Sequence, residues 1–128
     1  MQIREYQQWL EAWDRTRGWE RVAMSHTLIH ATEELGEVAR LILQWEGYKD
    51  LPDLERWRGE LEEELSDTII FLFKLAYQAG IDIESALTRG QAKAEARHMD
   101  PVVSAAELVH YLQRQRALLD AISEPSAE

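Results

Sequence analysis

Helical periodicity runs through almost the whole chain and constrains its fold more than any other feature. Apolar residues return every three or four positions, and no segment shows a convincing alternation with a period of two. Turn-forming residues separate the periodic segments, notably Gly18, Gly47, Gly80 and the pair Asp100-Pro101. The sequence therefore predicts an all-α fold.

The periodic segments predict five helices in one domain that occupies residues 1–123. A chain of 128 residues has the usual length of a single domain. Residues 124–128 are expected to form a disordered tail. The expected helices span residues 3–15, 25–45, 53–78, 83–97 and 104–122.

Residues that favour helix starts stand at four of these boundaries. Ser25 is the expected N-cap of the second helix, and the Pro-Asp pair at 52–53 is expected to start the third. Asp82 is the expected cap of the fourth helix. Ser104, followed three residues later by Glu107, forms a capping box that predicts the start of the fifth.

Charge and cysteine content exclude several classes of protein. The formal net charge of −10 argues against binding nucleic acid, because phosphate backbones repel an acidic surface. Without cysteine the chain has no disulfides, thiolate catalysis or zinc–sulfur sites. The N-terminus lacks the apolar core of a signal peptide, and the longest apolar run, 69–73, is too short to span a membrane. We expect a cytoplasmic protein without nucleic-acid or membrane partners.

Two pairs of acidic residues stand out in the second and third helices. Glu34 and Glu37 are three positions apart, and so are Glu64 and Asp67. This spacing places the members of each pair one turn apart on the same face of a helix. If the two helices are antiparallel neighbours, four carboxylates can converge on one point, which suits a hard cation such as Mg²⁺.

The position of these acids on the helical wheel separates a metal site from a solvated acidic face. Glu34 falls on the apolar side beside Trp45, and Glu64 lies at the margin of the apolar stripe beside Trp57. Burying ionised carboxylates there is costly unless a counter-charge compensates. Basic residues are scarce in those sectors, with Lys74 the nearest. A bound divalent ion explains the pattern better than a solvated face.

These motifs and the text around them resemble a known family. Glu-Glu-x-x-Glu at 33–37 and Glu-x-x-Asp at 64–67 are similar to the signature of the MazG-like, all-α nucleoside triphosphate pyrophosphohydrolases. The flanking segments ATEELGEVARLILQW and LEEELSDTIIFLFKLAYQAGIDIESAL resemble that superfamily too. Gly-Trp-Glu at 18–20 and Gln-Trp at 44–45 are most similar to its dCTP pyrophosphatase branch. The resemblance covers roughly residues 3–98.

The resemblance implies a fold, a cofactor and a reaction. It implies a four-helix core assembled as a homodimer or a dimer of dimers, with the helix at 104–122 as an addition without a clear family counterpart. It implies Mg²⁺, or Mn²⁺ in its place, bound by Glu34, Glu37, Glu64 and Asp67. The implied reaction is hydrolysis of a nucleoside triphosphate, such as a pyrimidine or modified deoxynucleotide, to the monophosphate and pyrophosphate. A water would attack the α-phosphorus while Glu34 or Glu37 takes its proton.

Further positions are expected to contact the base and the phosphates. Trp19 and Trp45 match aromatic residues that flank the base in the similar branch, and stacking contributes about 1–3 kcal/mol per base. The family usually carries a Lys, an Asn and an Arg at the end of the fourth helix, and here Gly90 and Ala94 stand at the first two positions. The expected substrate-binding residues are Trp19, His30, Trp45, Arg89, Lys93 and Arg97.

Some alternatives remain open from the sequence alone. A non-catalytic module that binds nucleotide with metal, or binds a protein partner, is the second hypothesis, because Gly90 and Ala94 lack the family's side chains. Trp9, Trp13 and Trp57 are expected to be core anchors rather than ligand contacts. The segment 69–73 is apolar all round, so the first and fifth helices or a second subunit must cover part of it.

Overall fold

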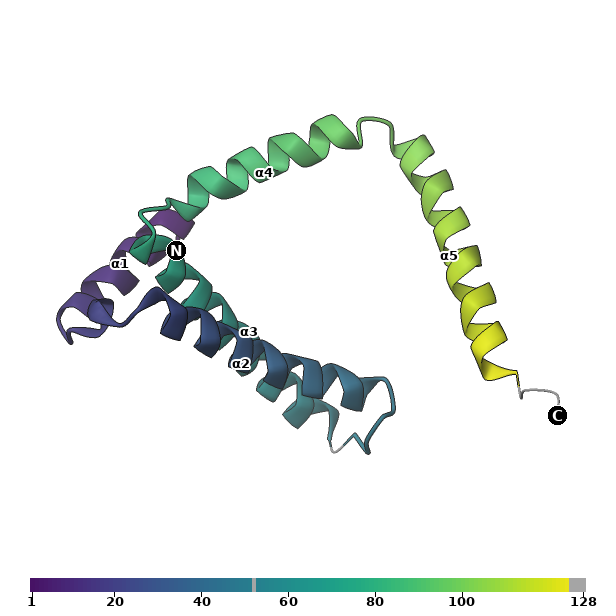
Figure 1. Ribbon diagram of the computed structural model, residues 1–128, viewed down its shortest axis with the longest axis horizontal. Coiled ribbons are helices and arrows are strands. Elements are labelled where there is room, and N and C mark those ends of the chain that lie inside the picture. Colours follow the sequence, from purple (N-terminus) through teal and green to yellow (C-terminus); the bar gives the residue numbers. More distant parts are fainter. Residues whose placement is uncertain (52, 125–128) are drawn as a thin grey trace. The chain divides into compact units, whose positions relative to one another are not determined.

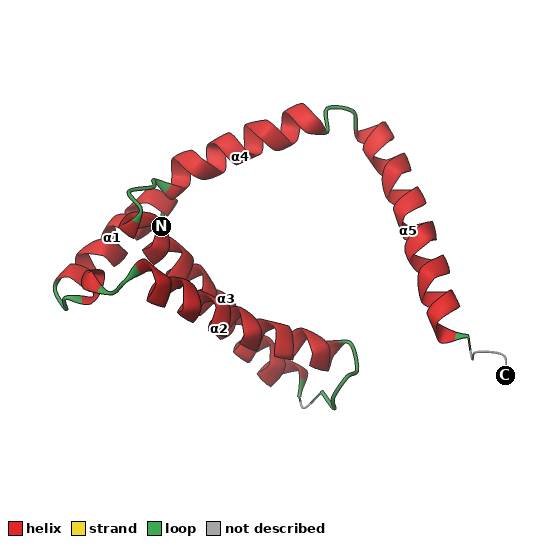
Figure 2. Ribbon diagram, viewed as in Figure 1, coloured by secondary structure: helices red, strands yellow, loops and turns green. Residues whose placement is uncertain are grey.

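All regular elements in the computed structural model, which describes residues 1–51 and 53–124, are helices (Figures 1 and 2). The all-α prediction is therefore confirmed over the described residues. In chain order these are α1 (Ile3–Arg15), the short 3₁₀ helix η1 (Trp19–Arg21), α2 (Met24–Trp45), α3 (Leu54–Gln78), α4 (Ile83–Arg97) and α5 (Pro101–Ser123). No helix of the described residues is long and apolar enough to cross a membrane.

Two of the predicted helix starts are wrong. The second helix begins at Met24 after an extended Ala23, so Ser25 lies inside its first turn instead of capping it. The capping box at Ser104 also lies inside a helix, because α5 begins earlier, at Pro101. There the Asp100 side chain accepts hydrogen bonds from the backbone amides of Val102 and Val103. Pro101 at the first helical position has no N–H that could be left unpaired. The helix therefore begins at the cap that comes first in the chain, Asp100, and not at Ser104.

The other two starts agree with the sequence. The Asp53 side chain accepts from the amides of Glu55 and Arg56, which makes Asp53 the N-cap of α3. The Asp82 side chain accepts from the Glu84 amide at the start of α4. Pro52 lies outside the described residues, as do residues 125–128 of the expected tail.

The chain divides into two compact units, residues 1–87 and 88–128. In the first unit, α2 and α3 run antiparallel and side by side, joined by the loop that follows Trp45 (Figure 1). The helix α1 packs against α3 in the same unit. In the second unit, every described residue of α5 except Ser104 is exposed.

The contact between α2 and α3 forms the core of the first unit. Leu41 is fully buried, and the indole of Trp57 donates a hydrogen bond of 2.9 Å to its carbonyl oxygen. At the other end of the pair, the buried Thr27 hydroxyl donates to the side chain of Gln78 at 2.8 Å. Hydrogen bonds at both ends of the apolar contact fix the register of the two helices.

A buried ion pair joins α1 to α3. The Lys74 ammonium lies 2.8 Å from the Asp14 carboxylate, and both side chains are almost fully buried. The Tyr77 hydroxyl donates a hydrogen bond to the same carboxylate. Lys74 was the nearest candidate for a counter-charge to the acidic motifs, but in the structure its partner is Asp14.

The start of α4 is tied to α1 by polar contacts. The side-chain amide of Gln7 donates to the carbonyl of Ile81 at 2.7 Å and accepts from the amide of Ile83 at 2.9 Å. The Arg4 guanidinium forms an ion pair of 2.8 Å with Asp82. The turn between α3 and α4 is therefore held against the first helix.

Several large apolar residues that were expected inside are exposed. Trp9 and Trp13 on α1 are exposed, so the expectation that they are core anchors of this chain is wrong, whereas Trp57 is buried as expected. Within the segment 69–73, Ile69 and Leu72 are exposed. The helices of the first unit leave this part of α3 uncovered.

Candidate metal centre

Three carboxylates from two helices converge at the middle of the α2–α3 pair. Glu34 comes from α2, and Glu64 and Asp67 come from α3. One ligand oxygen from each lies within 4.8 Å of the others. All three residues are half-buried, so they remain open to solvent on one side. Three oxygen donors at this spacing, with an open side, fit a hard divalent cation.

The packing of the two helices brings these acids together. On α3, Glu64 lies seven residues after the buried Trp57 and four before the buried Thr68, so it shares their side of the helix. On α2, Glu34 lies seven residues before the fully buried Leu41. The register that buries these apolar and hydroxyl side chains therefore also directs the carboxylates towards each other.

The charges in this cluster are poorly compensated by the protein. Burial raises the pKa of the Glu34 carboxyl, and its hydrogen bond with Glu64 and the negative charge of Asp67 raise it further. No ion pair of the described residues joins a basic side chain to any of the three acids. A bound divalent cation would supply the missing positive charge.

Glu37, the fourth acid of the sequence motifs, lies beside this cluster. Its carboxylate accepts a hydrogen bond of 2.7 Å from Nε of Arg40, one turn further along α2. The same guanidinium lies 3.9 Å from the Glu60 carboxylate of α3. The structure thus brings three of the four expected ligands together and places Glu37 in an ion pair.

Arg40 was not singled out from the sequence. On the helical wheel it falls on the polar side of α2 with Glu33 and Gln44, which is typical of a solvated residue. The sequence does hold one signal for Arg40, its spacing from Glu37, since an acid and a base three positions apart on a helix often form an ion pair. Its proximity to Glu60 depends on the packing of α3 and has no counterpart in local sequence.

His30 and Trp45 lie on α2 on either side of Glu34 along the helix, and each stacks on a residue of α3. The His30 ring stacks on Phe71 with centroids 5.2 Å apart, and its Nδ1 lies 3.5 Å from the exposed carboxylate of Glu33. The Trp45 ring stacks on the buried Trp57 at 4.8 Å, while 54% of Trp45 stays exposed. Each ring therefore has one covered face and an accessible remainder.

The other expected substrate contacts are Trp19 in the first unit and three residues of α4 in the second unit. Trp19 begins η1 and is exposed, and the Arg17 guanidinium lies 3.4 Å from the centroid of Trp13 and 5.7 Å from that of Trp19. On α4, three basic residues are exposed within the second unit. They are Arg89, Lys93 and Arg97.

Comparison with known proteins gives one family and one distant relative. The MazG nucleotide pyrophosphohydrolase domain matches residues 23–102, a stretch that holds α2, α3, α4 and the three clustered acids. Over 102 residues the chain is 28% identical to the uncharacterized protein YvdC of Bacillus subtilis (strain 168), a match that covers 76% of this chain and 96% of that protein. The relative adds no activity of its own, because it is uncharacterized.

Proposed function

The chain belongs to the MazG nucleotide pyrophosphohydrolase family, and on that premise we propose that it hydrolyses a nucleoside triphosphate to the monophosphate and pyrophosphate. The observation that carries the proposal is the convergence of Glu34, Glu64 and Asp67 without a basic partner. We propose a pyrimidine or modified deoxynucleotide as substrate and the cytoplasmic nucleotide pool as the place of action. The similarity of residues 18–20 and 44–45 to the dCTP pyrophosphatase branch supports that choice.

The carboxylates are proposed to have two roles, metal binding and acceptance of a proton. Glu34, Glu64 and Asp67 would hold Mg²⁺, or Mn²⁺ in its place, and Glu37 would join them on leaving Arg40. When bound, the ion supplies positive charge against the triphosphate and lowers the pKa of water. Attack on the α-phosphorus forms one oxygen–phosphorus bond and breaks the bond to the β-phosphate, so pyrophosphate leaves. Glu37 or Glu34 accepts the proton of the attacking water.

Aromatic and basic side chains are proposed to hold the rest of the nucleotide. The accessible parts of His30, Trp45 and Trp19 offer surfaces on which a base can stack. On α4, Arg89, Lys93 and Arg97 are proposed to meet phosphate oxygens.

A panel of nucleotides tests the reaction directly. Purified protein with Mg²⁺ is expected to release pyrophosphate and a monophosphate from at least one ribo- or deoxyribonucleoside triphosphate, and a chelator is expected to stop the release. Chromatography of the products distinguishes pyrophosphate from orthophosphate. Nucleotide binding without turnover of any triphosphate would contradict an enzyme and favour the non-catalytic binding module.

The uncovered apolar face of α3 supports self-association, and we propose a homodimer or a pair of such dimers. Ile69 and Leu72 are exposed on α3, and a hollow of about 500 Å³ beside Ile69 is lined by Ile3, Tyr6 and other residues. A contiguous apolar surface on a single chain is typical of an interface. Sedimentation is expected to show a dimer or larger species, and Ile69→Asp to shift it towards monomer. A monomeric wild-type chain at micromolar concentration would contradict the assembly.

A further inference from the structure

The candidate metal centre needs a cation besides the metal ion to hold a triphosphate. A triphosphate is strongly anionic, and a cluster of carboxylates repels it even when one divalent ion is bound between them. Most of the other basic side chains of the first unit, Arg21 and Arg56 included, already form ion pairs with acids outside the cluster. Arg4 pairs with Asp82, Arg15 with Glu11 and Lys74 with Asp14.

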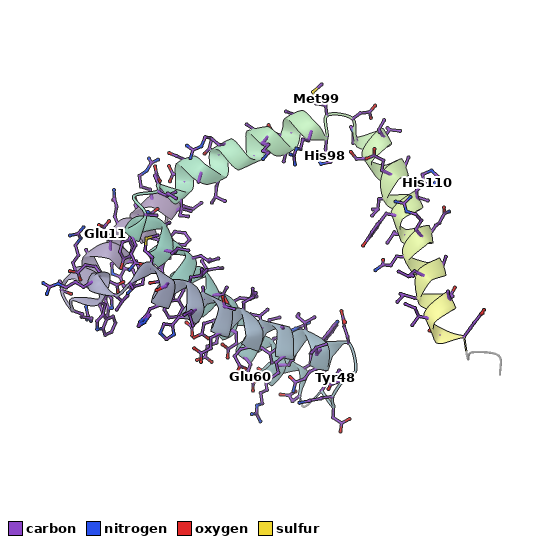
Figure 3. The ribbon with its side chains drawn as sticks, in the orientation of Figure 1. Glu11, Tyr48, Glu60, His98, Met99 and His110 are labelled. Carbon is purple, nitrogen blue, oxygen red and sulfur yellow. The ribbon has the colours of Figure 1, made fainter. Side chains whose placement is uncertain are left out.

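Arg40 is a cation that lies next to the acidic cluster. Its partner Glu37 lies one turn after Glu34 on α2, and its other partner Glu60 lies one turn before Glu64 on α3. The guanidinium therefore bridges the two helices next to the acidic cluster, on the side of the α2–α3 loop. In Figure 3, Glu60 and Tyr48 mark this part of the helix pair. The pKa of Arg40 is raised by its hydrogen bond to Glu37 and by the charges of Glu37, Glu60 and Glu64.

We propose that Arg40 is a phosphate-binding residue of this site, which holds Glu37 aside in the free protein and exchanges it for phosphate oxygens when metal and triphosphate bind. This inference rests on the proposed function, because it assigns a substrate contact to the same site. Arg40 thereby couples two events: the release of Glu37 towards the metal and the arrival of the phosphates.

The contacts of Arg40 make this exchange feasible. The ion pair with Glu37 is exposed, at 41% and 47% of the two side chains, and exposed pairs on helices are weak. The contact with Glu60 is long at 3.9 Å, and Glu60 also accepts a hydrogen bond of 2.8 Å from Arg56. A phosphate offers the guanidinium paired oxygens in a geometry that matches its planar fork.

Open space lies beside Arg40 on α2. A hollow of about 210 Å³ is lined by Arg40 together with Gly36, Leu43 and Lys49. The glycine presents no side chain there, and a Cβ at this position would meet nothing within 4 Å. The Arg40 side chain, 41% exposed, therefore borders open space on this side and is not enclosed by packed residues.

Binding of inorganic tripolyphosphate tests the inference without turnover. Calorimetry is done with Mn²⁺ alone and then with tripolyphosphate in the presence of Mn²⁺, on wild type and on Arg40→Ala. Losing a charge-assisted contact is expected to weaken tripolyphosphate binding about tenfold to a hundredfold. Affinity for Mn²⁺ alone is expected to be unchanged or higher, because Glu37 is freed. KM for the nucleotide is expected to rise in the same proportion as the loss of tripolyphosphate affinity.

The matched control is Arg56→Ala, which removes the same charge from the other partner of Glu60 and is expected to behave as wild type. Circular dichroism checks that each variant is folded, and Arg40→Gln replaces Arg40→Ala if that variant is not. The inference is overturned if Arg40→Ala binds tripolyphosphate like wild type, if its Mn²⁺ affinity falls as well, or if wild type binds no tripolyphosphate. If wild type binds tripolyphosphate through Arg40 but releases no pyrophosphate from any nucleotide, the phosphate-binding role of Arg40 is supported and the proposed reaction is contradicted.

Discussion

Asp67→Asn is expected to lower kcat for pyrophosphate release by two or more orders of magnitude, since a metal ion contributes several kcal/mol of transition-state stabilisation. The substitution keeps the size of the side chain and removes its negative charge. Asp67 shares a cluster with Glu34 and Glu64 in which all three oxygens lie within 4.8 Å of one another. Affinity for Mn²⁺, measured by calorimetry without nucleotide, is expected to fall together with kcat.

The stability of the same variant separates a metal ligand from a structural residue. The negative charge of Asp67 is one reason why the pKa of Glu34 is raised, so these carboxylates repel each other in the metal-free protein. Removing one of the repelling charges is expected to leave the melting temperature unchanged or higher in the presence of a chelator. A structural residue would behave in the opposite way and lower the melting temperature.

Glu63→Gln is the matched control for this experiment. It makes the same change of charge on α3, next to Glu64 in sequence, at an exposed position outside the cluster. Activity and Mn²⁺ affinity of Glu63→Gln are expected to match wild type. If Asp67→Asn and Glu63→Gln lose activity equally, the effect comes from net charge and the cluster is not a metal centre.

The helices and the convergence of three acids follow from spacing in the sequence. Helical periodicity sets which residues share a face, and Glu34, Glu64 and Asp67 share faces with residues that the helix pair buries. Which residues share a face is information local to each helix, whereas the convergence of the acids also requires α2 and α3 to pack side by side. The start of α3 also depends only on local sequence, because the Asp53 side chain caps the backbone amides of the two residues Glu55 and Arg56 that follow it closely.

The features that spacing did not predict depend on competition between partners. Two carboxylates one turn apart on α2 meet different neighbours, and Glu37 pairs with Arg40 because a base lies three residues beyond it. Lys74 pairs with Asp14, a residue far away in sequence that only the packing of α1 on α3 brings near. An apolar face on α1 has the same sequence pattern whether this chain or a second copy covers it, so the pattern alone does not distinguish a buried Trp13 from the exposed one observed.

Lys74→Met is expected to lower the free energy of unfolding by about 3–5 kcal/mol, because it leaves the Asp14 carboxylate buried without its ammonium partner. The Lys74 and Asp14 side chains are only 10% and 5% exposed, so water cannot replace the lost partner. The Tyr77 hydroxyl still donates to Asp14, and its raised pKa, caused by burial and by that hydrogen bond, keeps it protonated. One neutral donor does not compensate for a buried negative charge. Urea denaturation at a fixed protein concentration measures the change.

A second substitution shows whether Lys74→Met loses stability because a favourable contact is lost or because a buried charge is left unpaired. Asp14→Asn combined with Lys74→Met removes both charges and is expected to recover most of the loss, since neutral replacement of a buried ion pair is often tolerated. Lys49→Met, at an exposed lysine, is the control and is expected to change stability by less than about 0.5 kcal/mol. If Lys74→Met is as stable as wild type, the pair is not what holds α1 on α3. If the double variant is no more stable than Lys74→Met, the cost lies in lost packing of the long lysine side chain.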